Sequence, residues 1–103
     1  MNLAEYMAAH RKEVIPGVLE SFPRIKCKDG FSISIQAGRG MYCTPRDNQG
    51  PWREMEAGFP SDRPSDALME FAEESEKPTE TVYGYVPVEV LQAELDLHGG
   101  IDA

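Results

Sequence analysis

The stretch RIKCKDGFSISIQA, residues 24–37, is where apolar residues begin to recur at every second position. From Phe31 to Ala37 they alternate with Ser and Gln, which predicts a strand with one buried and one solvated face. Asp29-Gly30 supplies the positive φ angles of a tight hairpin turn, so residues 24–28 are predicted to form the partner strand. A sheet with one wet face is typically antiparallel.

Three further segments predict strands: 41–46 (MYCTPR), 52–59 (WREMEAGF) and 81–87 (TVYGYVP). The second of these is expected to point three residues inward, Met55, Ala57 and Phe59.

Apolar residues at helical spacing predict three helical regions. The first covers residues 3–22 and must kink or end at Pro16-Gly17, because proline removes a backbone donor. The second covers residues 65–75 with Ser65 as N-cap. The third covers residues 88–97, and its apolar stripe would leave its carboxylates in water. The order is α-β-β-β-β-α-β-α, an α+β fold with a mainly antiparallel four- to five-stranded sheet and helices packed on it.

A chain of 103 residues predicts a single domain, 1–103, with an N-terminal helical segment (1–22) and a sheet-and-helix part (23–101). The chain holds no run of about 18 apolar residues, and its start lacks a signal-peptide core. We therefore expect no membrane association and a location in the cytoplasm.

The net charge of −8 is unevenly distributed. Residues 1–49 hold seven Lys/Arg and five Asp/Glu, whereas residues 50–103 hold three and thirteen. Phosphates are bound by Lys and Arg, so the acidic half disfavours direct nucleic-acid binding. It favours a basic partner, including the nucleic-acid channel of another protein. The plainer alternative is that acidic surface keeps a small protein soluble.

The sequence gives little indication of catalysis. Cys27 and Cys43 are expected to be small buried side chains, with a disulfide possible only if their strands pair. His10 and His98 lie at opposite ends of the chain, without the spacing of zinc ligands or of a base beside a thiol. We therefore predict no catalytic residue, no metal and no cofactor, and a protein that is not an enzyme.

Basic residues suggest an anion-binding site. Arg24, Lys26 and Lys28 would share one strand face, with Arg39 and Arg46 in the adjoining turn and third strand. Five such cations together would suit a phosphate group or an acidic protein patch. In the alternative reading they pair across strands with neighbouring glutamates.

Aromatic residues are candidate contact residues. Turn chemistry explains the glycines and prolines of residues 36–52, but not Arg39, Arg46 or Trp52, which we predict to contact a partner. Tyr83 and Tyr85 would share one face, as core or as contact surface, with Gly84 marking a bulge or a close backbone approach. If their strand lies at a sheet edge, a homodimer is possible.

The predicted second helix carries acidic residues on its solvated face. Glu70, Glu73 and Glu74 are the candidate contacts there for a basic partner.

Two motif combinations, QAG…YCTPR and GPW…EAGFPS, together with PTETVYGYVPVEVLQAELDLHGG, resemble a family of small proteins of unknown activity from tailed bacteriophages and prophages. The resemblance covers about residues 23–101. It implies a phage-encoded accessory protein made in the cytoplasm of a bacterial host.

Three functions are weighed on this basis. The leading hypothesis is a non-enzymatic protein that binds and inhibits a bacterial host protein, such as a CRISPR-type defence effector. The first alternative is a small-ligand binder that captures an anion such as a nucleotide signal. The second is a minor phage assembly protein.

Overall fold

The computed structural model describes residues 1–15 and 19–102, so the predicted bend at Pro16-Gly17 lies outside the described residues. Its elements are α1 (Leu3–His10), β1 (Lys12–Ile15), β2 (Leu19–Ser21), β3 (Ile25–Lys26), β4 (Ser32–Gln36), β5 (Glu54–Gly58), α2 (Asp66–Met69), β6 (Val82–Pro87) and α3 (Val88–Leu97).

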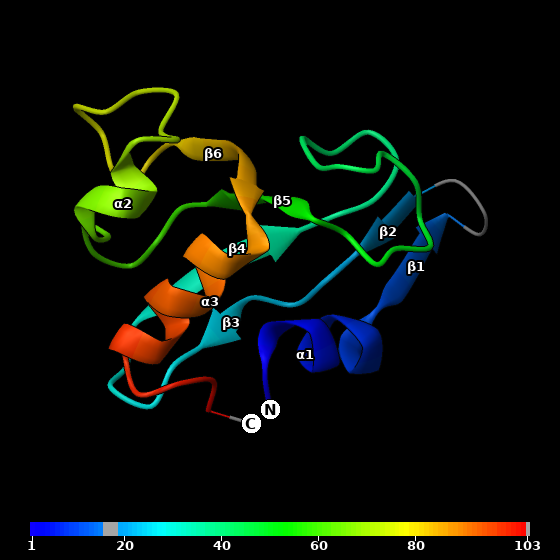
Figure 1. The fold of residues 1–103 in the computed structure, drawn as a ribbon, viewed down its shortest axis with the longest axis horizontal. Coiled ribbons are helices and arrows are strands. Elements are labelled where there is room, and N and C mark those ends of the chain that lie inside the picture. Colours follow the sequence, from blue (N-terminus) through cyan, green and yellow to red (C-terminus); the bar gives the residue numbers. More distant parts are fainter. Residues whose placement is uncertain (16–18, 103) are drawn as a thin grey trace.

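The main sheet has four antiparallel strands in the order β3-β4-β5-β6, which confirms the predicted α+β fold (Figure 1). Ile25 pairs with Ile33, and Ile35 pairs with Ala57, so the alternating apolar residues of neighbouring strands share one face. The strands β1 and β2 form a separate antiparallel hairpin.

The helices pack on this apolar face. Leu91 and Leu95 of α3, Leu68 of α2 and Leu3 of α1 are all fully buried in one core with the strand residues. Full burial of such side chains contributes about 1.5–3 kcal/mol each. The opposite face of the sheet carries the Ser and Gln residues of β4, which are half-buried. The two-residue alternation of β4 thus separates the core from the wet face as predicted.

The predicted N-terminal helix is wrong beyond His10. The helix α1 begins with a capping box, in which Asn2 Oδ1 accepts from the Glu5 N–H at 2.8 Å and Glu5 Oε1 accepts from the Asn2 N–H at 2.9 Å. After His10 the chain becomes extended and forms β1 and β2. The β-branched residues that precede Pro16 favour this outcome, since the residue before a proline avoids helical geometry.

Two other segments also differ from the prediction. Residues 41–46 form a loop with a single bridge, Thr44 to Glu54, rather than a third strand. Pro45 has no N–H to offer to a ladder there. The helix predicted over residues 65–75 is limited to α2, after which the chain continues in turns. Phe59, predicted to point inward, is 50% exposed at a positive φ of 51°.

Tyr83 and Tyr85 lie on opposite sides of β6, contrary to the prediction of a shared face. Tyr83 is fully buried, whereas Tyr85 is 41% exposed beside Tyr42. An irregularity in the pairing with β5 inserts one extra residue between Tyr83 and Val86 and so reverses the alternation. The bulge and close backbone approach expected at Gly84 are present, because an added Cβ would lie 3.4 Å from the Cβ of Tyr42.

Both outer edges of the main sheet are covered. On the β3 side, the Lys28 N–H donates to the Gly100 carbonyl and the Asp102 N–H donates to the Lys26 carbonyl. On the β6 side, the Glu73 N–H donates to the Val82 carbonyl, and the Tyr85 N–H donates to the Tyr42 carbonyl. The edge on which a homodimer was predicted is therefore already paired within the chain along this part of β6.

Candidate functional site

The five predicted cations do not form one cluster. The Arg24 guanidinium donates to Ser32 Oγ at 2.9 Å and also to the Phe59 carbonyl, at the start of β4. Lys26, which pairs with Ser32, and Lys28 are exposed near this same end of β4. The strand β4 is about 13 Å long at 3.3 Å per residue, and Arg39 and Arg46 lie in the loop that follows its other end. The predicted cluster of five cations is therefore not formed, while a binding role for each of these residues stays a prediction. Arg24 ties β4 to the end of β5.

The acidic candidates lie together on a folded but non-helical segment, residues 70–80. Glu70, Glu73 and Glu74 are exposed, and among the residues that the structure describes none forms an ion pair with them. The backbone beneath them is fastened to β6, since the Glu74 N–H donates to Thr81 Oγ1 at 3.0 Å and the Tyr83 hydroxyl donates to the Pro78 carbonyl. The backbone of this acidic segment is therefore held in place by its hydrogen bonds to Thr81 and to Tyr83 of β6.

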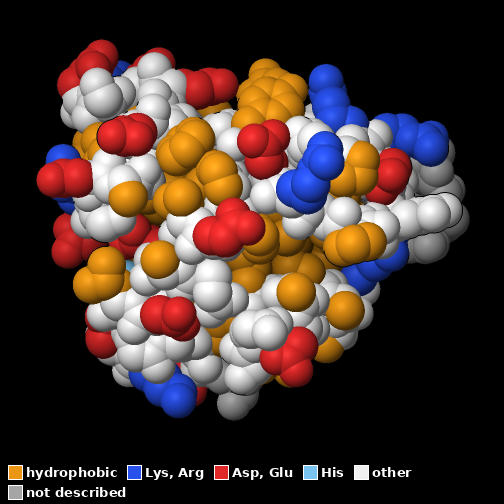
Figure 2. Space-filling model, in the orientation of Figure 1, with side chains coloured by type: hydrophobic (Ala, Val, Ile, Leu, Met, Phe, Trp, Pro, Cys, Tyr) orange, Lys and Arg blue, Asp and Glu red, His pale blue; other side chains and the backbone are white. Residues whose placement is uncertain are grey.

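Opposite charges gather at different ends of the molecule (Figure 2). Residues 62–80 contain seven acidic and two basic residues, whereas residues 38–53 contain three arginines and one aspartate. In Figure 2 the acidic side chains crowd the upper left, over α2 and the acidic segment. Lys and Arg side chains gather at the upper right, where Figure 1 places the loop between β4 and β5.

Trp52 is held by the loop that carries it. Its indole N–H donates to the Asp47 carbonyl at 3.0 Å, and its ring meets Phe22 edge-on at 6.0 Å between centroids. The Arg11 guanidinium lies over the indole, 5.9 Å from the ring centroid, at a cation–π distance. The predicted contact residue Trp52 is thus half-buried and fixed in orientation, beside α1 rather than beside Arg24.

Asp47 closes this loop. Its carboxylate accepts from the N–H groups of Gln49 at 3.0 Å and Gly50 at 3.1 Å. The pKa of Asp47 is lowered, first by these backbone donors and then by the charges of Arg11 and Arg39. The two arginines thus place positive potential at this end of the molecule.

The two cysteines are buried thiols at opposite ends of β4. Cys27 precedes the hairpin turn, while Cys43 Sγ lies 3.3 Å from both the N–H and the carbonyl of Gly38. Burial is the main cause that raises the pKa of each thiol. A raised thiol pKa opposes nucleophilic chemistry, because the thiolate is the reactive form.

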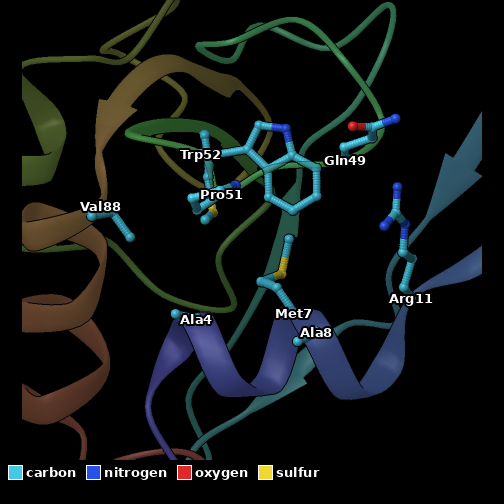
Figure 3. Close-up of a pocket in the computed structure, with 9 residues that line it drawn as sticks. Ala4, Met7, Ala8, Arg11, Gln49, Pro51, Trp52 and Val88 are labelled. Atoms are coloured by element: carbon cyan, nitrogen blue, oxygen red, sulfur yellow. The ribbon is translucent and has the colours of Figure 1, made fainter.

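A groove opens between α1 and the loop that carries Trp52, with a volume of about 360 Å³ (Figure 3). We call it the α1 groove. Its lining residues are Ala4, Met7, Ala8, Arg11, Gln49, Pro51, Trp52, Met55 and Val88.

The lining of the α1 groove is amphipathic. Met7 and Met55 form an apolar floor and are each 2% exposed. In Figure 3, Met7 points from α1 toward the indole of Trp52, and Arg11 and Gln49 lie together at the end away from Val88. The sequence pointed to Trp52 but not to the groove, because the walls come from three segments that are distant in the sequence, residues 4–11, residues 49–55 and Val88.

Glu94 belongs to a polar cluster with Ser65, His98 and Asp29 that was not predicted from the sequence. It was expected in water, yet it is only 3% exposed. Its carboxylate accepts from the N–H and the hydroxyl of Ser65, the N-cap residue of α2, and lies 3.4 Å from His98 Nε2. His98 in turn lies 2.6 Å from Asp29 and stacks on Phe31 at 3.9 Å between centroids. The i,i+4 spacing of Glu94 and His98 is the feature of the sequence that could have indicated their contact.

Asp29 makes part of the stability dependent on pH. Its pKa is lowered because the Phe31 N–H, and then the His98 side chain, stabilise the carboxylate. As the folded pKa is the lower one, this stabilisation is complete above about pH 4 and is lost as the pH falls through the folded pKa. We expect the difference in unfolding free energy between wild type and Asp29→Asn to shrink below about pH 4. Urea denaturation across pH measures it, and a pH-independent difference would contradict the expectation.

Within residues 1–15 and 19–102, no group of three or more His, Cys, Asp or Glu side chains is placed to hold a metal ion. In the same part of the chain, no helix has both the length and the apolar content needed to cross a lipid bilayer. Comparisons with models of protein families, with curated proteins and with solved structures find no match to this chain.

Proposed function

We propose that the protein is a non-enzymatic accessory protein of a phage or prophage that binds and inhibits a bacterial host protein in the host cytoplasm. The observation that carries the proposal is the acidic segment, residues 70–80, whose exposed carboxylates stand on a backbone fastened to β6. A surface that is ordered before binding loses less conformational entropy on association. It therefore suits a recognition role.

The charge of the acidic segment indicates the class of partner. Clustered carboxylates attract a basic surface and accelerate its encounter, with an effect that falls as salt rises. Proteins that bind nucleic acid carry such basic surfaces, and a CRISPR-type defence effector is one example. The nucleotide-binding alternative has less support, because Arg24 and Lys26 lie at the other end of β4 from Arg39, Arg46 and Trp52.

Charge reversal tests the proposal. The triple variant Glu70→Lys, Glu73→Lys and Glu74→Lys should reduce the amount of partner captured from bacterial lysate at low salt by about ten-fold or more, because steering and contact are both lost. Mass spectrometry identifies the captured protein, and circular dichroism checks that the fold is intact.

A matched control separates a local effect from net charge. Glu89, Asp96 and Asp102 are also exposed, and their reversal to lysine adds the same charge outside the acidic segment. This control should retain most of the capture. Equal losses in the two triple variants would argue against a docking role for the acidic segment. If the capture is repeated from a phage-infected lysate, recovery of only virion components would favour the assembly alternative.

A further inference from the structure

Two exposed tyrosines form a pair where the loop after β4 meets β6. The ring centroids of Tyr42 and Tyr85 lie 5.8 Å apart, and each residue is 41% exposed. The backbone holds the pair together, since the Tyr85 N–H donates to the Tyr42 carbonyl at 3.0 Å. The Tyr42 side chain also packs against Gly84. The two rings are therefore positioned before any partner binds.

The conformation of Tyr85 is unfavourable for folding alone. Its φ of 53° lies in the left-handed region, which a bulky side chain rarely adopts. The irregular pairing with β5 turns its ring away from the core, so that an apolar surface meets water. Strained backbone of this kind concentrates at functional sites. We therefore expect the Tyr85 ring to serve binding rather than stability.

Two carboxylates border the tyrosine pair. Glu54 and Glu56 alternate along β5 with buried residues, so they share with Tyr85 the face that points away from the core. Glu56 Oε1 accepts from the Tyr42 N–H at 3.2 Å, and Glu54 Oε1 accepts from Thr44 Oγ1 at 2.8 Å. In the part of the chain that the structure describes, neither carboxylate forms an ion pair with a Lys or Arg side chain. The pair of rings is thus complemented by negative charge.

The chemistry of this surface fits one kind of group. A guanidinium is planar, so it can stack on a tyrosine ring while its N–H groups donate to a carboxylate. An ammonium group offers charge without that plane, and an acid would be repelled by both glutamates. The rings are exposed rather than enclosed, which suits a side chain presented by another protein better than a free small molecule.

We propose that this surface binds an arginine side chain of a protein partner. We call it the Tyr-Glu surface, which consists of Tyr42, Tyr85, Glu54 and Glu56. It is separate from the acidic segment, and the inference does not rest on the proposed function, because the experiments below use no host protein.

A short peptide with one central arginine between glycines is the probe. In an NMR titration, the amide signals of Tyr42, Tyr85 and Glu56 should shift to saturation. A peptide with citrulline in place of arginine keeps the shape but not the charge, and should bind about ten-fold more weakly. A lysine peptide should bind more weakly than the arginine peptide, because it lacks the stacking plane. Equal binding of the arginine and citrulline peptides, no saturable shift, or shifts confined to residues 70–80 would overturn the proposal.

Variants separate the contributions of ring and charge. Tyr85→Asn should weaken binding of the arginine peptide about three-fold, while the fold is kept because asparagine tolerates a positive φ. Tyr85→Phe keeps the ring and should retain most of the binding. Glu56→Gln keeps an acceptor for the Tyr42 N–H and should also weaken binding about three-fold, because the charge is lost.

The chain offers a matched control for each change. Phe59 is another exposed aromatic residue at a positive φ, so Phe59→Asn controls for Tyr85→Asn. Glu89 is an exposed glutamate of α3, so Glu89→Gln controls for Glu56→Gln. Both controls should bind the arginine peptide as the wild type does. Binding that survives both Tyr85→Asn and Glu56→Gln, or that falls equally in the controls, would refute the assignment.

Light scattering identifies the source of the arginine. The net charge of −8 opposes self-association, so the protein alone should be a monomer across a range of concentrations. A dimer that Tyr85→Asn dissociates would assign the arginine to a second copy of this chain and would overturn the proposal of a different protein partner.

Discussion

Tyr83→Ala is expected to lower the free energy of unfolding by about 4 kcal/mol, because it empties a fully buried aromatic site in β6. Tyr83 packs in the core, and its hydroxyl lies 3.7 Å from Met69 Sδ and donates to the Pro78 carbonyl. A domain of this size is commonly stable by 5–15 kcal/mol, so the variant should lose a large fraction of the total. Urea denaturation followed by circular dichroism measures the loss.

Tyr83→Phe is the matched control, because it keeps the ring and removes only the hydroxyl. It should cost about 1 kcal/mol, the usual net value of one hydrogen bond. Its effect should be local, with faster amide hydrogen exchange at Lys77 and Glu80, whose N–H groups form the turns of the acidic segment. A loss below about 1.5 kcal/mol in Tyr83→Ala would contradict the packing described for Tyr83.

Glu94→Ala is expected to lower the free energy of unfolding by about 3 kcal/mol. The carboxylate accepts from both the N–H and the hydroxyl of Ser65, so alanine leaves these donors without their partner at the start of α2. It also removes a neighbour of His98. The measurement is the urea unfolding midpoint at neutral pH, with the slope of the transition compared to confirm that only stability has changed.

Two substitutions control for Glu94→Ala. Glu89→Ala removes an exposed glutamate from the same helix and should cost about 0.5 kcal/mol. Glu94→Gln keeps the shape and one carbonyl acceptor, so its loss should be intermediate. If Glu94→Ala and Glu89→Ala destabilise equally, Glu94 does not hold α2 against α3.

The strands were predictable where residues alternate strictly. Ile33 and Ile35 alternate with serines and glutamine, and that period fits only a sheet with one buried face. The strict alternation is interrupted where a single residue departs from regular strand geometry. The bulge between Tyr83 and Val86 turned Tyr85 to the other side, and Phe59 left the core at a positive φ. Periodicity cannot place such breaks, because tertiary contacts decide them.

The candidate sites show the same division. The acidic and basic ends follow from the uneven charge of the two halves of the sequence, and the structure keeps them apart. Glu94 was missed because its charge suggested solvent, although it lies three residues after buried Leu91 and therefore on the same side of α3. The α1 groove depends on how α1, the Trp52 loop, β5 and α3 meet. No local pattern in the sequence predicts how these four parts of the fold pack against one another.

The paired edges of the main sheet limit how another protein can join it. A guest strand would first have to displace residues 100–102 from β3 or residues 72–73 from β6, at the cost of bonds already made within the chain. A partner that binds at this sheet is therefore expected to contact its side chains rather than to add a strand to its edge. The same closure hinders edge-to-edge association of one copy with the next, because the covered parts of β3 and β6 have no backbone groups left to pair with a further strand.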